Sequence, residues 1–147
     1  MNKDLDGREE LVDHTSRSKP RILLAEDNRV NQKIACLMLE KAGFCVDVVE
    51  DGLQATEAVE SRSYDLILMD CMMPGMDGYK ATAKIRRMNG AKSRIPIIAL
   101  TANTMMGDRD RCIEAGMDDF LPKPINRSGM LEIIDRWISF LKKSDAE

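Results

Sequence analysis

Histidine is almost absent from this sequence, and the one present, His14, lies in a polar N-terminal segment. A histidine zinc site, a Ser-His-Asp triad and a Cys-His pair are therefore excluded from the globular part of the chain. The four cysteines, Cys36, Cys45, Cys71 and Cys112, form no CxxC pair. Reduced structural thiols are the simplest interpretation of that spacing.

A long apolar run and an excess of basic charge are also lacking. No stretch approaches the ~20 apolar residues of a membrane span, and the N-terminus lacks the apolar core of a signal peptide. The net charge of −3 gives no basic field for sequence-independent binding of nucleic acid. We therefore expect a soluble, cytoplasmic protein with no membrane segment in this chain and no direct nucleic-acid partner.

The polarity of the two ends sets the expected domain limits. Residues 1–19 are polar, carry mixed charges and show no sustained apolar period. This composition predicts a tail or the end of a linker, with a short helix at Glu9–Val12 as one option. Residues 20–143 are expected to form one compact domain, and residues 144–147 a C-terminal tail.

Within that domain, short apolar segments alternate with segments of helical periodicity. The predicted strands are Arg21–Ala25, Phe44–Val49, Tyr64–Met69, Ile95–Leu100 and Asp118–Leu121. The predicted helices are one capped by Asn28 and ended by Gly43, one over Leu53–Ser61, Tyr79–Met88, Thr104–Ala115 ended by Gly116, and Arg127–Lys142. This alternation predicts an α/β fold, in which a parallel sheet lies between two layers of helices.

Helical spacing supports the first and last helices. In the first helix it links Val30, Ile34, Leu37, Met38 and Lys41, and the last helix carries a strong apolar stripe that is expected to face inward. The arginines outside these stripes are interpreted as solvated helix and loop charges: Arg86, Arg87, Arg94, Arg109 and Arg111.

Chemically matched side chains follow four of the five strands. Glu26 and Asp27 come after the first strand, Asp70 after the third, Thr101 after the fourth and Lys123 shortly after the fifth. Open parallel sheets bind ligands beyond the carboxyl ends of their strands, so these groups would converge if the strands are neighbours. Crowded carboxylates need a cation among them, and hard oxygen ligands favour Mg²⁺.

A magnesium site with a lysine and a threonine beside it is typical of phosphoryl transfer. Neither a P-loop nor a GxGxxG motif occurs, so a nucleotide is not the obvious phosphoryl donor. A carboxylate is the remaining candidate nucleophile, and Asp70 on the central strand is the best placed. Taken alone, Asp70 could equally be a helix cap or a turn residue.

As a set and in this order, the motifs resemble the receiver domain of two-component response regulators over Pro20–Lys142. The match consists of Glu26-Asp27, Asp70 with the turn MPGMDG that holds Pro74 and Gly75, Thr101 in ALTAN, and Lys123-Pro124 in DDFLPKP. The combination of EDN, NQKIA, ALTAN and MDDFLPKPI is most similar to receivers of hybrid sensor histidine kinases.

The resemblance implies a (βα)5 flavodoxin-like fold, a three-layer sandwich whose five-stranded parallel sheet has the order 2-1-3-4-5. It also implies that Asp70 accepts a phosphoryl group from a phosphohistidine on a histidine kinase or a histidine phosphotransfer protein. Mg²⁺ would be bound by Asp27, by Asp70 and by the backbone carbonyl of Met72, with Glu26 acting largely through water.

Further roles follow from the same resemblance. Lys123 would pair with the phosphate or with Asp70, and Thr101 would hydrogen-bond a phosphoryl oxygen. Phe120 would swing inward behind Thr101 and change the surface of the fourth helix, fifth strand and fifth helix. Members of the family also dimerise through that surface, and no sequence feature decides this for the present chain.

Three more positions carry implied roles. The Lys123–Pro124 peptide bond is expected to be cis. Met72 and Ala102 flank the path of the hydrolytic water and so tune the lifetime of the phosphorylated state, which the sequence does not give.

Two other functions compete with the phosphorylatable receiver. A pseudo-receiver would keep the fold and serve only for docking or dimerisation, but none of the five site residues is missing. A Mg²⁺-dependent phosphatase would need a second acid two residues after its nucleophile, where Met72 stands. The resemblance implies that the domain catalyses its own phosphorylation and dephosphorylation. It leaves open whether the parent protein is a hybrid kinase or a free-standing regulator.

Overall fold

The computed structural model of the chain describes residues 19–102 and 106–146. Strands and helices alternate through these residues. The strands are β2 (Arg21–Ala25), β3 (Cys45–Val49), β4 (Leu66–Asp70), β5 (Ile97–Thr101) and β6 (Asp119–Pro122). The helices are α1 (Arg29–Lys41), α2 (Gly52–Ser61), α3 (Gly78–Arg86), the short 3-10 helix η2 (Gly90–Arg94), α4 (Met106–Ala115) and α5 (Arg127–Ala146).

Most predicted elements are present, with shifted ends. The third strand begins at Leu66 rather than Tyr64 and includes Asp70, and α5 continues to Ala146. Helix η2 was not predicted. The option of a helix at Glu9–Val12 and the start of the fourth helix at Thr104 lie outside the described residues.

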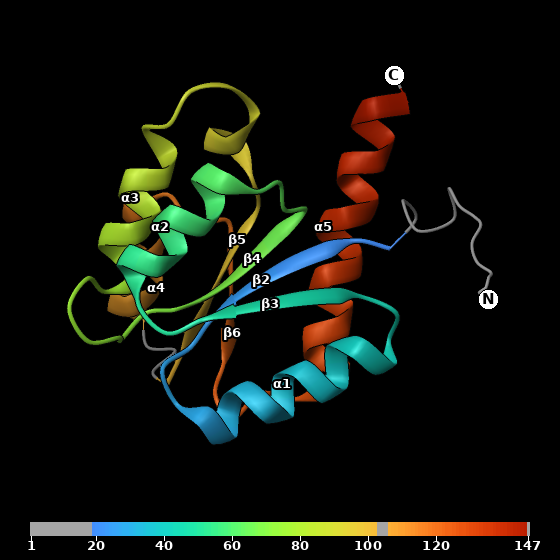
Figure 1. Cartoon of the computed structure of the whole chain (residues 1–147), viewed down its shortest axis with the longest axis horizontal. Coiled ribbons are helices and arrows are strands. Elements are labelled where there is room, and N and C mark those ends of the chain that lie inside the picture. Colours follow the sequence, from blue (N-terminus) through green and yellow to red (C-terminus); the bar gives the residue numbers. More distant parts are fainter. Residues whose placement is uncertain (1–18, 103–105, 147) are drawn as a thin grey trace.

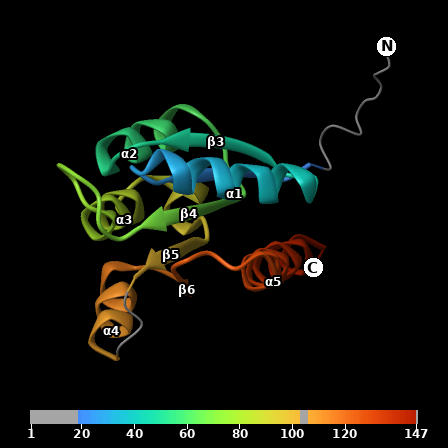
Figure 2. The same ribbon diagram turned by 90° about the horizontal axis from the view of Figure 1, so that it is seen from below.

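The sheet has the strand order β3-β2-β4-β5-β6, and every pair of neighbours is parallel. This order confirms the predicted 2-1-3-4-5 topology. Figure 1 shows the strands side by side, and Figure 2 shows α1 and α5 on one face of the sheet with α2, α3 and α4 on the other. The structure is therefore the expected three-layer α/β sandwich.

Strand β4 shows why the central strands are continuous apolar runs. All five of its residues are buried, because helices cover both faces of the sheet. Leu66 and Leu68 pack into the cluster under α1 and α5, whereas Ile67 and Met69 pack into the cluster under α2, α3 and α4. The strand thus fills two cores and delivers Asp70 to its carboxyl end.

Short polar side chains begin the helices that follow the strands. Asn28 Oδ1 accepts the N–H of Asn31 at 3.0 Å at the start of α1, and Asp77 Oδ1 accepts the N–H of Lys80 at 2.9 Å at the start of α3. Asp51 caps α2 in the same way. Such caps satisfy backbone donors that the first helical turn leaves unpaired. They fix where each helix leaves the functional edge of the sheet.

The expected solvation of the arginines is wrong for Arg86. Its guanidinium donates to the carbonyl oxygens of Gly116, Ser93 and Ile95 at 2.7–2.9 Å and pairs with Asp118 at 2.8 Å. One side chain therefore ties α3 to the residue after α4, to η2 and the residue that follows it, and to the residue before β6. The sequence pattern does not predict these contacts of Arg86, because most of its partners are backbone carbonyl oxygens.

Two more of these arginines stack on aromatic rings. The Arg111 guanidinium lies 4.1 Å from the centroid of the Tyr79 ring, and that of Arg109 lies 4.7 Å from the centroid of the Phe120 ring. Within the described residues, no helix combines the length and the apolar character that crossing a membrane requires.

Candidate functional site

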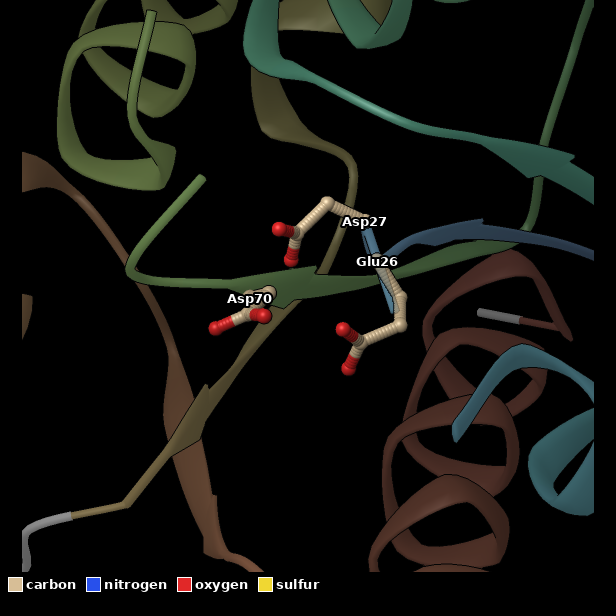
Figure 3. Close-up of side chains that lie close together, drawn as sticks. All are labelled: Glu26, Asp27 and Asp70. Atoms are coloured by element: carbon tan, nitrogen blue, oxygen red, sulfur yellow. The ribbon is translucent and has the colours of Figure 1, made fainter. Parts of the chain in front are cut away.

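Three carboxylates meet at the carboxyl edge of the sheet. Strands β2 and β4 are paired with Ala25 opposite Met69, so the residues that follow, Glu26 and Asp70, come side by side. Oxygen atoms of Glu26, Asp27 and Asp70 all lie within 4.8 Å of one another. Figure 3 shows the three side chains gathered around the ends of the two strands. The structure thus brings together the acids that the sequence placed at this edge.

The environments of these acids differ. Glu26 and Asp70 are 1% and 3% exposed, whereas Asp27 is exposed to solvent. Burial raises the pKa of the Asp70 carboxyl, and the negative charge of Glu26 adds to the increase, while the hydrogen bonds from Lys123 and from the Met72 N–H oppose it. Asp70 is therefore a desolvated carboxyl group whose charged form needs a cation beside it.

Lys123, the residue after β6, supplies that positive charge. Its Nζ lies 2.8 Å from Asp70 Oδ2 and 3.1 Å from Glu26 Oε1. Burial acts to lower the pKa of Lys123, but the hydrogen bonds and charges of the two carboxylates outweigh it and raise the pKa. The lysine therefore stays protonated and binds both buried acids.

Backbone and amide groups hold the acids in place. Asp70 Oδ1 accepts the N–H of Met72 at 3.1 Å, and Glu26 Oε2 accepts the N–H of Asn28 at 3.0 Å. The side-chain amide of Gln32 on α1 donates to the Glu26 carbonyl oxygen at 2.6 Å. The sequence analysis missed Gln32 as a positioning residue, and its only signal was its place in NQKIA.

The loop after Asp70 is shaped by two glycines. Gly75 has a φ of +70°, a conformation that residues with a side chain rarely adopt. A Cβ at Gly78 would lie 2.2 Å from the carbonyl oxygen of Asp70, so only glycine fits there. Pro74 and Met72 in this loop are exposed, Met72 to 71%. The loop therefore packs against the Asp70 backbone and leaves Met72 at the mouth of the site.

Thr101 and Phe120 lie on the two strands beyond Asp70. Thr101 ends β5, is buried, and accepts the backbone N–H of Lys123 at its carbonyl at 2.8 Å. Phe120 on β6 packs against the core under α2, α3 and α4, beneath Arg109. Ala102 follows Thr101 and is exposed. The Lys123–Pro124 peptide bond is cis, as the resemblance implies.

The donor set fits a hard divalent cation. All three acidic residues offer carboxylate oxygens, and two of them are buried. A bound divalent cation would offset the free-energy cost of desolvating these two carboxylates. Oxygen-only ligands suit Mg²⁺ or Ca²⁺ better than zinc. The cluster is therefore a candidate site for a divalent metal ion.

An apolar surface borders this site. In α1, Val30, Ile34 and Leu37 are 65%, 44% and 60% exposed, whereas Ala35 and Leu39 are fully buried. The predicted helix is confirmed, but Val30, Ile34 and Leu37 point away from the core, which Leu39 and Ala35 enter. A cavity of about 360 Å³ lies between Ile34 and the segment Lys123–Ile125. The apolar face of α1 and the lysine of the acidic site thus share one groove.

The parallel sheet carries three clustered carboxylates, a lysine and a threonine at the carboxyl ends of its strands, and so defines an α/β protein with a candidate metal site at its switch point. A family model of the response regulator receiver domain matches residues 22–135. The chain belongs to that family.

Relatives and solved structures agree with this assignment. The chain is 45% identical over 121 residues to the hybrid signal transduction histidine kinase B of Dictyostelium discoideum, a match that covers 76% of this chain and 6% of that protein. It is 43% identical over 148 residues to histidine kinase 1 of Arabidopsis thaliana, covering 78% of this chain and 12% of that protein. The chain thus spans a small fraction of the length of these relatives.

Among solved structures, the receiver domain of the sensor histidine kinase PA1611 from Pseudomonas aeruginosa has 49% sequence identity and a TM-score of 0.77, over 82% of this chain and 98% of that one. That structure holds a magnesium ion coordinated in its active-site cleft. The receiver domain of Ssk1 from Saccharomyces cerevisiae, solved with the histidine phosphotransfer protein Ypd1, matches with 28% identity and a TM-score of 0.77, over 84% and 91% of the two chains.

Proposed function

We propose that this receiver domain accepts a phosphoryl group on Asp70, from a phosphohistidine on a partner protein, in a Mg²⁺-dependent reaction. The observation that carries the proposal is the pairing of a buried Asp70 with Lys123 inside a cluster of three carboxylates. Such a carboxylate is desolvated, which raises its reactivity, and it has a cation beside it to take up developing charge.

The residues that would hold the metal are Asp27, Asp70 and the backbone carbonyl of Met72, with Glu26 acting through water. When bound, Mg²⁺ supplies positive charge for the phosphoryl oxygens. Glu26 keeps its position through Asn28 and Gln32. Because Lys123 already contacts both buried acids, its ammonium needs only a small movement to reach an oxygen of the phosphoryl group.

Phosphorylation would change the surface formed by α4, β6 and α5. A dianion on Asp70 would attract the Thr101 hydroxyl at the end of β5, since hydroxyl groups donate to phosphate oxygens. Phe120 packs on the neighbouring strand and would then move inward. Met72 and Ala102, both exposed at the mouth of the site, would govern access of water and so the lifetime of the phosphorylated state.

The apolar face of α1 is the proposed contact for the phosphodonor. Val30, Ile34 and Leu37 are spaced so that they share one face, and the adjoining groove leads to Lys123. Exposed apolar residues next to a reactive group are typical of a protein-binding surface. The Ypd1–Ssk1 complex supports a histidine phosphotransfer protein or a histidine kinase as the partner. Leu37→Glu should slow transfer from such a partner and leave labelling by a small phosphodonor unchanged.

The parent protein is proposed to be a hybrid sensor histidine kinase, because hybrid kinases recur among the similar proteins. A cytoplasmic location of this domain is part of the proposal. A free-standing response regulator is the second candidate. In either case the domain would catalyse its own phosphorylation and dephosphorylation. Purification of the native protein with its flanking sequence would distinguish the two by mass.

The decisive experiment is incubation with acetyl phosphate and Mg²⁺, followed by intact mass measurement. The expected result is a single phosphoryl adduct that needs Mg²⁺, is lost in Asp70→Asn, and persists in Asp135→Asn, which removes an exposed acid from α5. An unmodified protein that nevertheless binds the metal would overturn the proposal and favour a docking module without phosphorylation.

A further inference from the structure

A second cavity lies at the opposite edge of the sheet from Asp70. It has a volume of about 330 Å³ and is formed by the segment between α2 and β4 together with the segment around η2. Three basic residues from these two segments, Arg62, Lys92 and Arg94, line it together with Tyr64. We propose that this basic pocket binds a small organic anion, a phosphate monoester with an aromatic body. The proposal is independent of the phosphorylation of Asp70.

Positive charge in the basic pocket exceeds negative charge. The Lys92 ammonium donates to the carbonyl oxygen of Glu60 at 2.5 Å, a neutral acceptor that fixes the group and leaves its charge uncompensated. Arg94 is exposed and has no ion pair within the described part of the chain. The Arg62 guanidinium forms an ion pair with Asp47 Oδ2 at 3.0 Å. The basic pocket is therefore locally positive, although the whole chain carries a net charge of −3.

One carboxylate also lines the pocket and must be weighed against the cations. Asp65 Oδ2 accepts the backbone N–H of Arg21 at 2.7 Å, so this oxygen is already held by a donor outside the pocket. Three cations face a single acid, and only one of the three, Arg62, has an ion-pair partner of its own. An anion with two charged oxygens could therefore bind Lys92 and Arg94 together.

The backbone that carries Lys92 and Arg94 is held by hydrogen bonds. Arg86 donates to the carbonyl oxygens of Ser93 and Ile95 at 2.9 and 2.7 Å, on either side of Arg94. The Ser93 hydroxyl donates to the Gly90 carbonyl at 2.8 Å. Binding groups on a fixed backbone lose less conformational entropy when a ligand arrives. Arg86, which is partly buried, thus keeps the anion-binding segment in place.

Apolar and aromatic groups form the rest of the wall. Val59 and Ile95 are nearly fully buried, and Pro96 closes the pocket beside them. The Tyr64 hydroxyl donates to Asp47 Oδ2 at 2.7 Å, so the ring supplies apolar contact while its polar group is already satisfied. Inorganic phosphate would leave this wall unused. A ring attached to the phosphate would bury against it, which is why we assign an aromatic ester.

The test is an NMR titration of the metal-free protein with phenyl phosphate. Saturable shifts are expected at residues 62–65 and 91–96, with a Kd of about 1 mM or tighter. The double variant Lys92→Ala/Arg94→Ala should weaken binding about tenfold, equivalent to about 1.4 kcal/mol. The control Lys33→Ala/Lys41→Ala removes the same charge from exposed positions of α1, on the other face of the sheet, and should bind as the wild type does.

Two further probes test the assigned ligand class. Inorganic phosphate should bind more weakly than phenyl phosphate, and phenol should cause no saturable shift. Repeating the titration with Asp70→Asn should give the same Kd, since the acidic site is at the other edge. Absence of saturation, equal affinity in wild type and Lys92→Ala/Arg94→Ala, or equal affinity for phosphate and its phenyl ester would overturn the proposal.

Discussion

The ammonium of Lys123 lies 2.8 Å from Asp70 Oδ2, so an ion pair joins the residue after the edge strand β6 to the end of the central strand β4. The same ammonium lies 3.1 Å from Oε1 of Glu26, the residue after β2. One lysine thus compensates the charge of two buried acids, and a divalent cation at this site would bind the same carboxylates. Metal binding and the lysine contacts are therefore coupled.

Replacement of this lysine should lower the stability of the metal-free protein and strengthen its binding of metal. Lys123→Met keeps the length of the stem and removes the charge, which leaves two buried carboxylates without a cation. We expect the metal-free protein to lose about 2 kcal/mol of unfolding free energy, less than for a fully buried pair because the lysine is partly exposed. Mg²⁺ should bind more tightly, since a competing positive charge is gone.

Urea unfolding without metal and calorimetric titration with Mg²⁺ measure these two effects. Lys80→Met, which changes an exposed lysine on α3, serves as the control and should alter neither. Weaker Mg²⁺ binding in Lys123→Met would contradict the idea that ammonium and metal compete.

Asp70→Asn should stabilise the metal-free protein at neutral pH. Because burial raises the pKa of Asp70, its carboxyl contributes stability in the protonated form, and this contribution is lost as pH rises through the raised pKa. Asparagine stays neutral at every pH and escapes that loss. The melting temperature of the variant should exceed that of the wild type at pH 7, and the difference should shrink in acid below the ordinary carboxyl range.

Saturating Mg²⁺ should reverse the order, since a ligand that binds only the folded state stabilises it. Thermal melts with and without the ion check both statements. Asp135→Asn should follow the wild type throughout, and a melting temperature of Asp70→Asn below that of the wild type in metal-free buffer at pH 7 would refute the prediction.

Arg86→Ala should be among the most destabilising single changes. It removes donors from three carbonyl oxygens and leaves Asp118 without its cation. Loss of such a network costs about 2–4 kcal/mol. The adjacent Arg87 is exposed, and Arg87→Ala should change the unfolding free energy by less than about 0.5 kcal/mol. Chemical denaturation of the pair gives the comparison, and equal effects would show that Arg86 is not a structural hub.

The sequence predicts strands well where both faces are buried. In β4 an unbroken apolar run ends in Asp70, and burial of all five residues explains why no alternation appears. The convergence of the acids depended on strand order, which the pattern of residues leaves open. That order came from resemblance to the receiver family, and the pairing of β2 with β4 confirms it.

The errors concern side chains whose partners are backbone atoms or distant residues. Arg86 looks like any exposed arginine of an amphipathic helix, since its acceptors are carbonyl oxygens that no sequence pattern marks. In α1, helical spacing identifies a helix but not which face is buried, and here Val30 and Leu37 face solvent while Ala35 faces the core. Small buried residues give a weak hydrophobic signal.

Gly78→Ala should disturb the site without touching a functional side chain. The added Cβ would overlap the carbonyl oxygen of Asp70, a backbone atom that cannot rotate away. We expect a loss of about 1–3 kcal/mol and weaker Mg²⁺ binding, because Asp70 would shift. Gly129→Ala in α5 meets only ordinary contacts and should raise stability by about 0.5–1 kcal/mol. Denaturation and metal titration of both variants separate crowding from helix propensity.

Ionisation of Tyr64 should lower the stability of the fold at high pH. Burial raises the pKa of this phenol to about 12, and its hydrogen bond to Asp47 adds to the increase. A raised pKa favours the neutral form, so the stability that it contributes is complete below the ordinary tyrosine pKa and is lost as pH rises toward 12. Burial raises the pKa of Tyr79 as well, so the ultraviolet titration should show little tyrosinate near pH 10.

Asp47→Asn separates the two causes of the Tyr64 shift. The variant keeps the burial of the ring and removes the carboxylate, so the pKa of Tyr64 should fall but stay above its ordinary value. Tyr64→Phe assigns the signal by deleting it. If Asp47→Asn left the pKa of Tyr64 unchanged, the hydrogen bond at 2.7 Å would contribute nothing to it. Because the raised pKa keeps the phenol neutral, ionisation of Tyr64 should not change the affinity of the basic pocket for phenyl phosphate between pH 7.5 and 9.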